Sequence, residues 1–186
     1  MQLTIPTLLT LARILMIPVL VLVFYLPVDW SNIAAVTLFI LAGLTDWLDG
    51  WVARRFRMTS SFGAFLDPVA DKLMVGVALI IIVQRHPEIG LALSAAVIIG
   101  REITISALRE WMAAVGESGR VKVAWAGKIK TILQMVAIGF LLYGEPLGPI
   151  PVLDIGRWLL IGAAALTIWS MLSYLRSAWP AMRSRP

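Results

Sequence analysis

The chain has 186 residues, of which 60% are hydrophobic and 15% are charged, and its mean hydropathy is +0.88. Soluble domains average about 25% charged residues, so this composition predicts an integral membrane protein. The absence of cysteine excludes disulfides, thiolate metal sites and a cysteine nucleophile. The net charge is +5, but the basic residues flank apolar runs without interleaved aromatic residues, so we expect membrane lipid and no nucleic acid as a partner.

Six apolar runs predict an all-α, polytopic membrane protein, a bundle of six transmembrane helices that forms a single domain over residues 1–186. The first run resembles the apolar core of a signal peptide, but no small-residue cleavage site follows it, and we expect it to be retained. Residues 1–7 are expected to form a short interfacial segment that breaks from the first helix near Pro6. In chain order the runs are Leu8–Leu26, Ile33–Val52, Phe62–Val83, Leu91–Met112, Ile129–Tyr143 and Ile155–Leu175.

The distribution of basic residues predicts the orientation in the membrane. Basic residues gather in the second-to-third connection, in the fourth-to-fifth region and in the C-terminal tail, whereas the other three connections hold few of them. Because positively charged loops stay in the cytoplasm, we expect both termini to be cytoplasmic. The basic residues of these three segments are Arg54, Arg55, Arg57, Arg109, Arg120, Lys122, Lys128, Lys130, Arg176, Arg183 and Arg185.

Four aspartates lie where the second and third predicted helices meet, in TDWLDGWVARRFRMTSSFGAFLDPVADK, residues 45–72. Asp46 and Asp49 are spaced i, i+3, and Asp67 and Asp71 are spaced i, i+4, so each pair shares one helix face. Asp49 precedes Arg54 by roughly 7 Å of helix, and Asp67 follows Gly63 by roughly 6 Å. The pairs are therefore expected to converge just beneath the cytoplasmic surface.

Converging carboxylates in a low dielectric need protons or cations as partners. A proton relay and a metal site both satisfy this need. A metal site made only of oxygen ligands selects hard cations such as Mg²⁺ or Mn²⁺, and four carboxylates suit two ions about 3.5–4 Å apart. The small residues Gly50, Ala53 and Gly63 would let a ligand approach the backbone, and Arg54 suits a phosphate. Alternatively, the small residues only let helices pack closely.

These residues follow the pattern D-x-x-D-G-x-x-A-R, then eight residues, then G-x-x-x-D-x-x-x-D. The pattern resembles the signature of the CDP-alcohol phosphotransferase family. The segments IPTLLTLARI, FGAFLDPVADK, REITISALREWMA and GKIKT also resemble the bacterial phosphatidylglycerophosphate synthase branch of that family. One departure is Thr7 after Pro6, where the broader family commonly has Asn. The positions that carry the pattern are Asp46, Asp49, Gly50, Ala53, Arg54, Gly63, Asp67 and Asp71.

The resemblance implies transfer of a phosphatidyl group from CDP-diacylglycerol to sn-glycerol 3-phosphate with release of CMP. It also implies a homodimer of six-helix bundles in the bacterial inner (cytoplasmic) membrane, with the active site open to the cytoplasm. By this resemblance two Mg²⁺ or Mn²⁺ ions are held by the four aspartates, and Asp71 is also the general base. The residues that it assigns to CDP-diacylglycerol are Asp49, Gly50, Ala53, Arg54 and Gly63.

An acceptor that carries its own phosphate calls for a basic cluster near the metals but distinct from them. Candidates on the cytoplasmic side are Arg13, Arg101, Arg109, Lys128 and Lys130. Ordinary positive-inside anchoring is the alternative for the basic residues of the connections. For Arg101, which precedes Glu102 inside the fourth run, a buried structural pair is an equal alternative.

Three other functions stay open at this point. A sibling enzyme would use another acceptor, such as inositol phosphate or serine. A cation or proton transporter would also carry membrane carboxylates, but the charges cluster on one side and no inverted repeat is evident. A non-catalytic assembly subunit would leave the four aspartates unexplained.

Overall fold

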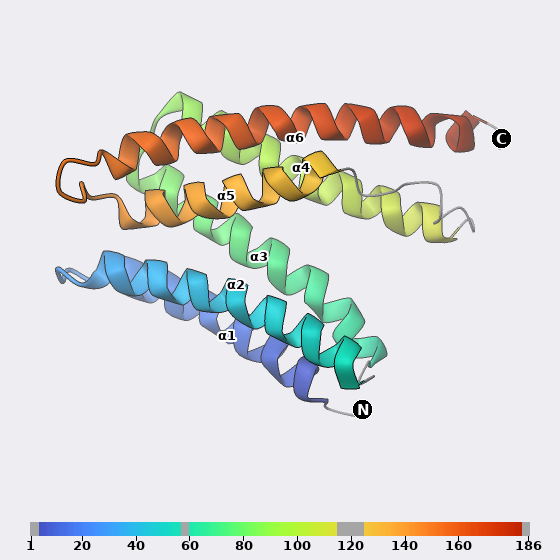
Figure 1. Ribbon diagram of the computed structural model, residues 1–186, viewed down its shortest axis with the longest axis horizontal. Coiled ribbons are helices and arrows are strands. Elements are labelled where there is room, and N and C mark those ends of the chain that lie inside the picture. The colour runs from blue at the N-terminus through green and yellow to red at the C-terminus, as the bar shows by residue number, and fades with distance from the viewer. Residues whose placement is uncertain (1–3, 57–59, 115–124, 184–186) are drawn as a thin grey trace.

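A computed structural model of the chain describes residues 4–56, 60–114 and 125–183. Within these ranges the chain is helical and forms no strand beyond an isolated bridge between Leu147 and Ile150, which confirms the predicted all-α class. Figure 1 shows the helices, which are α1 (Ile5–Phe24), α2 (Ser31–Phe56), α3 (Ser61–Arg85), α4 (Ile89–Ala114), α5 (Trp125–Tyr143) and α6 (Val152–Arg183).

The start of α1 differs from the expected interfacial segment. Thr4 is the N-cap of α1, and Pro6 lies in its first turn. A proline is tolerated there because the first backbone N–H groups of a helix have no partner within the helix. The predicted break near Pro6 is therefore wrong for residues 4–7, and residues 1–3 lie outside the described chain.

Several helices are long and apolar enough to cross a bilayer, which makes the chain a multi-pass membrane protein. Four stretches meet both criteria within the described residues: Pro6–Phe24, Ser31–Ala53, Ile89–Met112 and Val152–Ser173. The apolar stretch of α5, Ile129–Tyr143, is shorter, and α3 carries Asp67, Asp71 and Lys72 in its first half.

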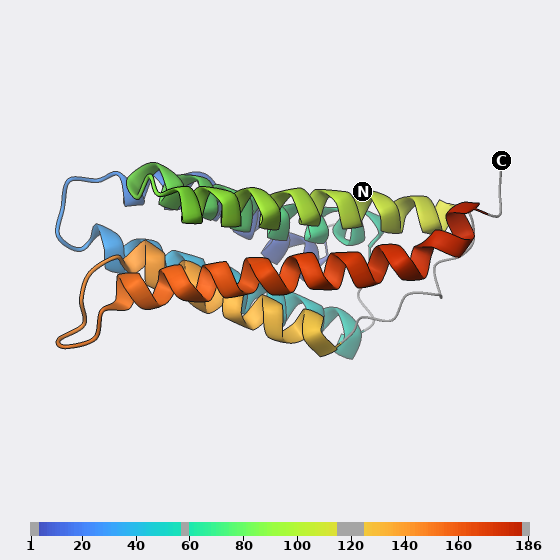
Figure 2. The ribbon, with the colours of Figure 1, turned by 90° about the horizontal axis from the view of Figure 1, so that it is seen from above.

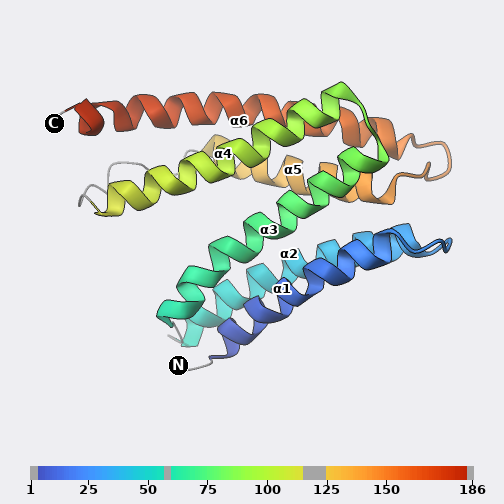
Figure 3. The same ribbon diagram turned by 180° about the vertical axis from the view of Figure 1, so that it is seen from behind.

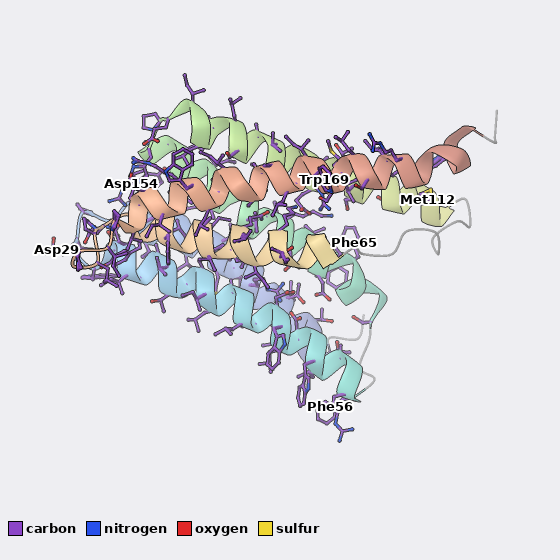
Figure 4. The ribbon with its side chains drawn as sticks, turned by 45° about the horizontal axis from the view of Figure 1, so that its top comes forward. Asp29, Phe56, Phe65, Met112, Asp154 and Trp169 are labelled. Atoms are coloured by element: carbon purple, nitrogen blue, oxygen red, sulfur yellow. The ribbon has the colours of Figure 1, made fainter. Side chains whose placement is uncertain are left out.

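Large apolar side chains cover the outside of the bundle, as a lipid environment requires. Phe56, Phe65 and Trp169 are 59%, 66% and 70% exposed, and they project away from the helices in Figure 4. In water such a surface would be unfavourable, whereas in a bilayer it contacts acyl chains.

The six helices form two groups that α3 connects. The first group is α1 packed along α2 (Figure 3), and the second is α6 packed against both α4 and α5 (Figure 2). Figure 3 shows α3 crossing from the first group to the second, and it contacts α1, α4 and α5. The α1–α2, α3–α4 and α5–α6 connections lie at one end of the bundle, and both termini lie toward the other end (Figure 1).

The apolar core fills the half of the bundle next to the α1–α2, α3–α4 and α5–α6 connections. It includes Leu20, Phe39, Ile82, Ile98 and Leu141, each no more than 1% exposed. The opposite half instead buries polar side chains, among them Thr10, Arg13, Asp49, Lys130 and Gln134. One half is thus packed and apolar, while the half nearer the termini contains the buried polar groups.

A polar network closes the packed end. Asn32 at the start of α2 donates to Glu145 Oε1 at 2.7 Å and accepts from Arg85 at 2.7 Å. Glu145 follows α5 and Arg85 ends α3. The network therefore links the α1–α2, α3–α4 and α5–α6 connections. Packing and hydrogen bonds therefore hold this end of the bundle.

Two glycines of α6 allow a matched test of the packing between α5 and α6. A Cβ at Gly156 would lie 3.0 Å from Leu141 Cγ and 3.1 Å from Phe140 Cβ, whereas a Cβ at Gly162 would meet nothing within 4 Å. We expect Gly156→Ala to destabilise the protein by about 1–3 kcal/mol through overpacking. Gly162→Ala should be neutral or stabilising, because alanine is the better helix former. Thermal unfolding in detergent measures both, and equal melting temperatures would contradict this packing.

Candidate functional site

A cavity of about 560 Å³ lies among α1, α2, α3, α4 and α5. Its walls combine apolar residues with a set of charged and amide side chains. Those polar residues are Arg13, Asp46, Asp71, Lys72, Glu102 and Gln134. Ionisable side chains within membrane-spanning helices are energetically unfavourable and are usually kept for a function. Such a mixture is therefore typical of a functional site.

Arg13 on α1 holds three of the four aspartates together. Its Nη1 donates to Asp46 Oδ1 at 2.9 Å and to Asp71 Oδ1, while its Nη2 donates to Asp49 Oδ2. The Arg13 side chain is 1% exposed and that of Asp49 is 3% exposed. Because buried like charges repel strongly, this guanidinium is what allows the carboxylates of α2 and α3 to converge.

The fourth aspartate, Asp67, contacts a different residue of α1. Thr10 lies one turn before Arg13, and its hydroxyl donates to Asp67 Oδ1. Thr10 Oγ1 also lies 3.1 Å from the carbonyl oxygen of Pro6. One face of α1 therefore meets both aspartate pairs that the sequence analysis expected to converge.

The aspartates suit divalent metal ions by their chemistry. All donors are carboxylate oxygens, the ligands that hard cations prefer. The side chains of Asp46 and Asp71 are 46% and 47% exposed, and both residues line the cavity, so they are accessible to an ion. Within the described chain, no three His, Cys, Asp or Glu side chains are arranged to hold one ion, and Arg13 lies among three of the carboxylates.

Gly63 is required by a close approach between α1 and α3. A Cβ there would lie 2.9 Å from Thr7 Oγ1 and 3.0 Å from Ser60 Oγ. Ser60 caps α3 by accepting from the Gly63 N–H at 3.0 Å, and its hydroxyl lies 2.9 Å from that of Thr7. Thr7, the position that departs from the wider family, thus joins α1 to the start of α3. Gly50 and Ala53 are partly buried on α2.

Two of the predicted phosphate-binding residues meet at Glu102. Arg101 Nη1 and Lys130 Nζ each donate to Glu102 Oε1 at 2.9 Å. This cluster joins α4 to α5, and Glu102 lines the cavity while Lys130 is 2% exposed. Arg13, a third candidate, lies among the aspartates. Its predicted role toward an acceptor phosphate stays a prediction, as do those of Arg101 and Lys130.

The remaining basic candidates lie on described helices, but their side chains are outside the described part of the structure. Arg54 is on α2, Arg109 is on α4 and Lys128 is on α5. Their predicted roles stay predictions.

Several polar residues of the site were not predicted from the sequence, among them Thr10, Lys72 and Gln134. Thr10 contacts Asp67, and Lys72 and Gln134 line the cavity. Each had a signal in the sequence: Thr10 is one turn from Arg13, Lys72 follows Asp71, and Gln134 is a polar residue inside an apolar run. None of these signals identifies a partner on another helix.

An apolar groove of about 640 Å³ lies between α2 and α5. Gly43 and Met135 line both this groove and the polar cavity, so the two spaces adjoin. Its other lining residues include Phe39, Ile40 and Phe140. The site therefore combines a charged chamber with an adjoining apolar one.

The sequence model of the CDP-alcohol phosphatidyltransferase family matches residues 3–169. The chain belongs to this family. The match confirms the resemblance that the aspartate pattern indicated. A protein of Pseudomonas fluorescens named CDP-diacylglycerol–glycerol-3-phosphate 3-phosphatidyltransferase is 53% identical to this family member over 97% of this chain and 92% of its own. A protein of Escherichia coli (strain K12) with the same name is 51% identical over 96% of each chain.

Removing the guanidinium tests its part in the stability of this phosphatidyltransferase-family site. We expect Arg13→Met to lower the free energy of unfolding by about 3 kcal/mol, because buried Asp49 would lose its cation. Adding Asp49→Asn to Arg13→Met should restore part of that loss. Unfolding of wild type, both single variants and the double variant in detergent measures the coupling. Strictly additive effects would show that the two side chains do not interact.

Proposed function

We propose that this protein transfers the phosphatidyl group of CDP-diacylglycerol to sn-glycerol 3-phosphate, giving phosphatidylglycerophosphate and CMP. The observation that carries the proposal is the carboxylate-lined cavity that adjoins an apolar groove. It occurs in a chain whose relatives, at 51% and 53% identity, bear the name of this activity. A charged chamber beside an apolar one suits a lipid substrate with a nucleotide headgroup.

Asp46, Asp49, Asp67 and Asp71 are the residues that would hold two divalent ions, Mg²⁺ or Mn²⁺. The family is generally dependent on divalent metals, and the all-oxygen donor set agrees with hard cations. When bound, such ions supply positive charge that stabilises the phosphoryl oxygens and the departing CMP.

Asp71 is the proposed general base. Its carboxylate takes the proton of the 1-hydroxyl as that oxygen forms a bond to the phosphatidyl phosphorus, and the bond from phosphorus to the CMP oxygen breaks. Asp71 lines the cavity, and Arg13 donates to its Oδ1. A base must be within hydrogen-bond reach of the proton that it removes, and these contacts hold the carboxylate at the cavity wall.

The other assignments complete the proposal. The CDP part of the lipid contacts Asp49, Gly50, Ala53, Arg54 and Gly63. The acceptor phosphate is bound by residues from the basic set, which comprises Arg13, Arg101, Arg109, Lys128 and Lys130. In Figure 1 both termini lie toward the end of the bundle away from the α1–α2, α3–α4 and α5–α6 connections, which agrees with an even number of crossings.

We further propose six transmembrane helices in a single domain over residues 1–186, with both termini and the active site facing the cytoplasm of a bacterial inner membrane. The basic connections support this orientation. A homodimer is part of the same proposal.

An assay of the detergent-solubilised protein tests the function. CMP release from CDP-diacylglycerol should require glycerol 3-phosphate and Mg²⁺, and EDTA should abolish it. Glycerol 3-phosphate, inositol phosphate and serine offered in competition would identify the acceptor. Preference for either of the last two would assign a sibling activity, and cation flux in vesicles without CMP release would favour a transporter.

The general base has its own test. Asp71→Asn should lower the turnover number by at least about 100-fold, since it cannot accept the proton, while CDP-diacylglycerol binding largely persists. Asp29→Asn is the matched control, because Asp29 is exposed in the α1–α2 connection at the other end of the bundle (Figure 4). Near-normal turnover of Asp71→Asn would rule out this assignment.

A further inference from the structure

The cavity divides into two regions of opposite charge. One region holds Asp46 and Asp71 beside Arg13. Arg13 pairs with three aspartates, so carboxylates outnumber cations in this region. The other region centres on Glu102, which pairs with Arg101 and Lys130, and on Lys72, which reaches α4. Lys72 and Glu102 line the cavity, whereas Arg101 and Lys130 contact Glu102 without lining it. Together these groups bring three cations to one carboxylate.

Lys72 is distinguished from the other cations of the site by its partner. Its Nζ donates to the hydroxyl of Ser106 on α4. Among the residues that the structure describes, no carboxylate forms an ion pair with it, whereas Arg13, Arg101 and Lys130 each have one. An ammonium at a cavity wall with only a neutral hydroxyl as partner is suited to bind an anion.

Glu102 holds the neighbouring cations in place. Its Oε1 accepts from Arg101 and from Lys130, and it lies one turn before Ser106 on α4. The Lys72–Ser106 contact and the Glu102 cluster are therefore adjacent along one helix. A phosphate monoester carries about −1.5 to −2 charges at neutral pH, which matches a region with surplus positive charge.

Gln134 provides a second, independent feature of the same cavity. It lies one turn after Lys130 on α5, lines the cavity and is 5% exposed. Its Oε1 is buried and has no hydrogen-bond partner within the described chain. Buried polar atoms are normally paired, so this amide is suited to a hydrogen bond from a ligand.

We propose that Lys72 and Gln134 recognise the acceptor, with Lys72 binding its phosphate and Gln134 binding the hydroxyl that does not react. This proposal rests on the proposed function and adds to it two residues that select a phosphorylated polyol. Because Asp71 and Lys72 both line the cavity, an acceptor held by Lys72 shares that space with the base that takes its proton.

Lys72→Met tests the phosphate contact. We expect kcat/KM for glycerol 3-phosphate to fall about 10- to 100-fold, the cost of a lost charge-assisted hydrogen bond. The KM for CDP-diacylglycerol should change little, and Lys72→Arg should keep part of the activity. Arg176→Met, which removes an exposed cation of α6, is the control. If Lys72→Met does not fold, Lys72→Gln replaces it.

Gln134→Leu tests the hydroxyl contact through a pair of acceptors. With glycerol 3-phosphate we expect kcat/KM to fall about threefold to tenfold, as for a neutral hydrogen bond. With 3-hydroxypropyl phosphate, which lacks the middle hydroxyl, wild type and Gln134→Leu should be equally active. Gln84→Leu is the control, since Gln84 is exposed and accepts from Tyr25 at 3.0 Å, outside the cavity.

A binding measurement separates this proposal from the proposed function. Glycerol 3-phosphate should raise the melting temperature of the wild type, and this shift should shrink in Lys72→Met. The role of Lys72 would be overturned if Lys72→Met lowered kcat/KM equally for glycerol 3-phosphate and CDP-diacylglycerol, or if it left the melting-temperature shift unchanged. Lys72 would then be a counter-charge for the aspartates. The role of Gln134 would be overturned if Gln134→Leu lowered kcat/KM equally for glycerol 3-phosphate and for 3-hydroxypropyl phosphate. A wild type that does not use glycerol 3-phosphate would overturn the proposed function itself.

Discussion

The buried guanidinium of Arg13 is the interaction on which the functional half of this protein depends. It donates to carboxylates of α2 and α3, and these would repel one another in a low dielectric without a cation. It therefore joins three helices at a single point. The same helix face brings Thr10 to Asp67, so α1 organises both aspartate pairs, although it carries no acidic residue of its own.

The bundle separates stability from chemistry along its length. The half beside the α1–α2, α3–α4 and α5–α6 connections has an apolar core and a network through Asn32, Arg85 and Glu145. The half nearer the termini holds the cavity and the buried polar groups. A rigid packed end allows the helices at the other end to enclose a polar space without a continuous apolar core. The adjoining groove between α2 and α5 extends that space toward the apolar surface.

Opposite charges on different helices divide the cavity by chemistry. The carboxylates come from α2 and α3, whereas the basic region is built on α4 and α5 around Glu102. Lys72 connects the regions, because it follows Asp71 on α3 and contacts Ser106 on α4. Under the proposed function, this separation would let one cavity hold cations beside the aspartates and an anion beside the basic residues, as a reaction between two phosphorylated substrates requires.

The sequence by itself determined the all-helical class, the family, and the positions of the helices to within about four residues, except that α6 continues to Arg183, past the predicted end at Leu175. Periodic spacing also showed which aspartates share a helix face, because that depends only on the local helical repeat. The tertiary structure decided the partners: Arg13 among the aspartates, Thr10 against Asp67, and Lys72 and Gln134 at the cavity. These contacts depend on how each helix is rotated and how far it is shifted along its neighbours. Residues more than 30 positions apart set that arrangement through packing, and a linear pattern does not record it.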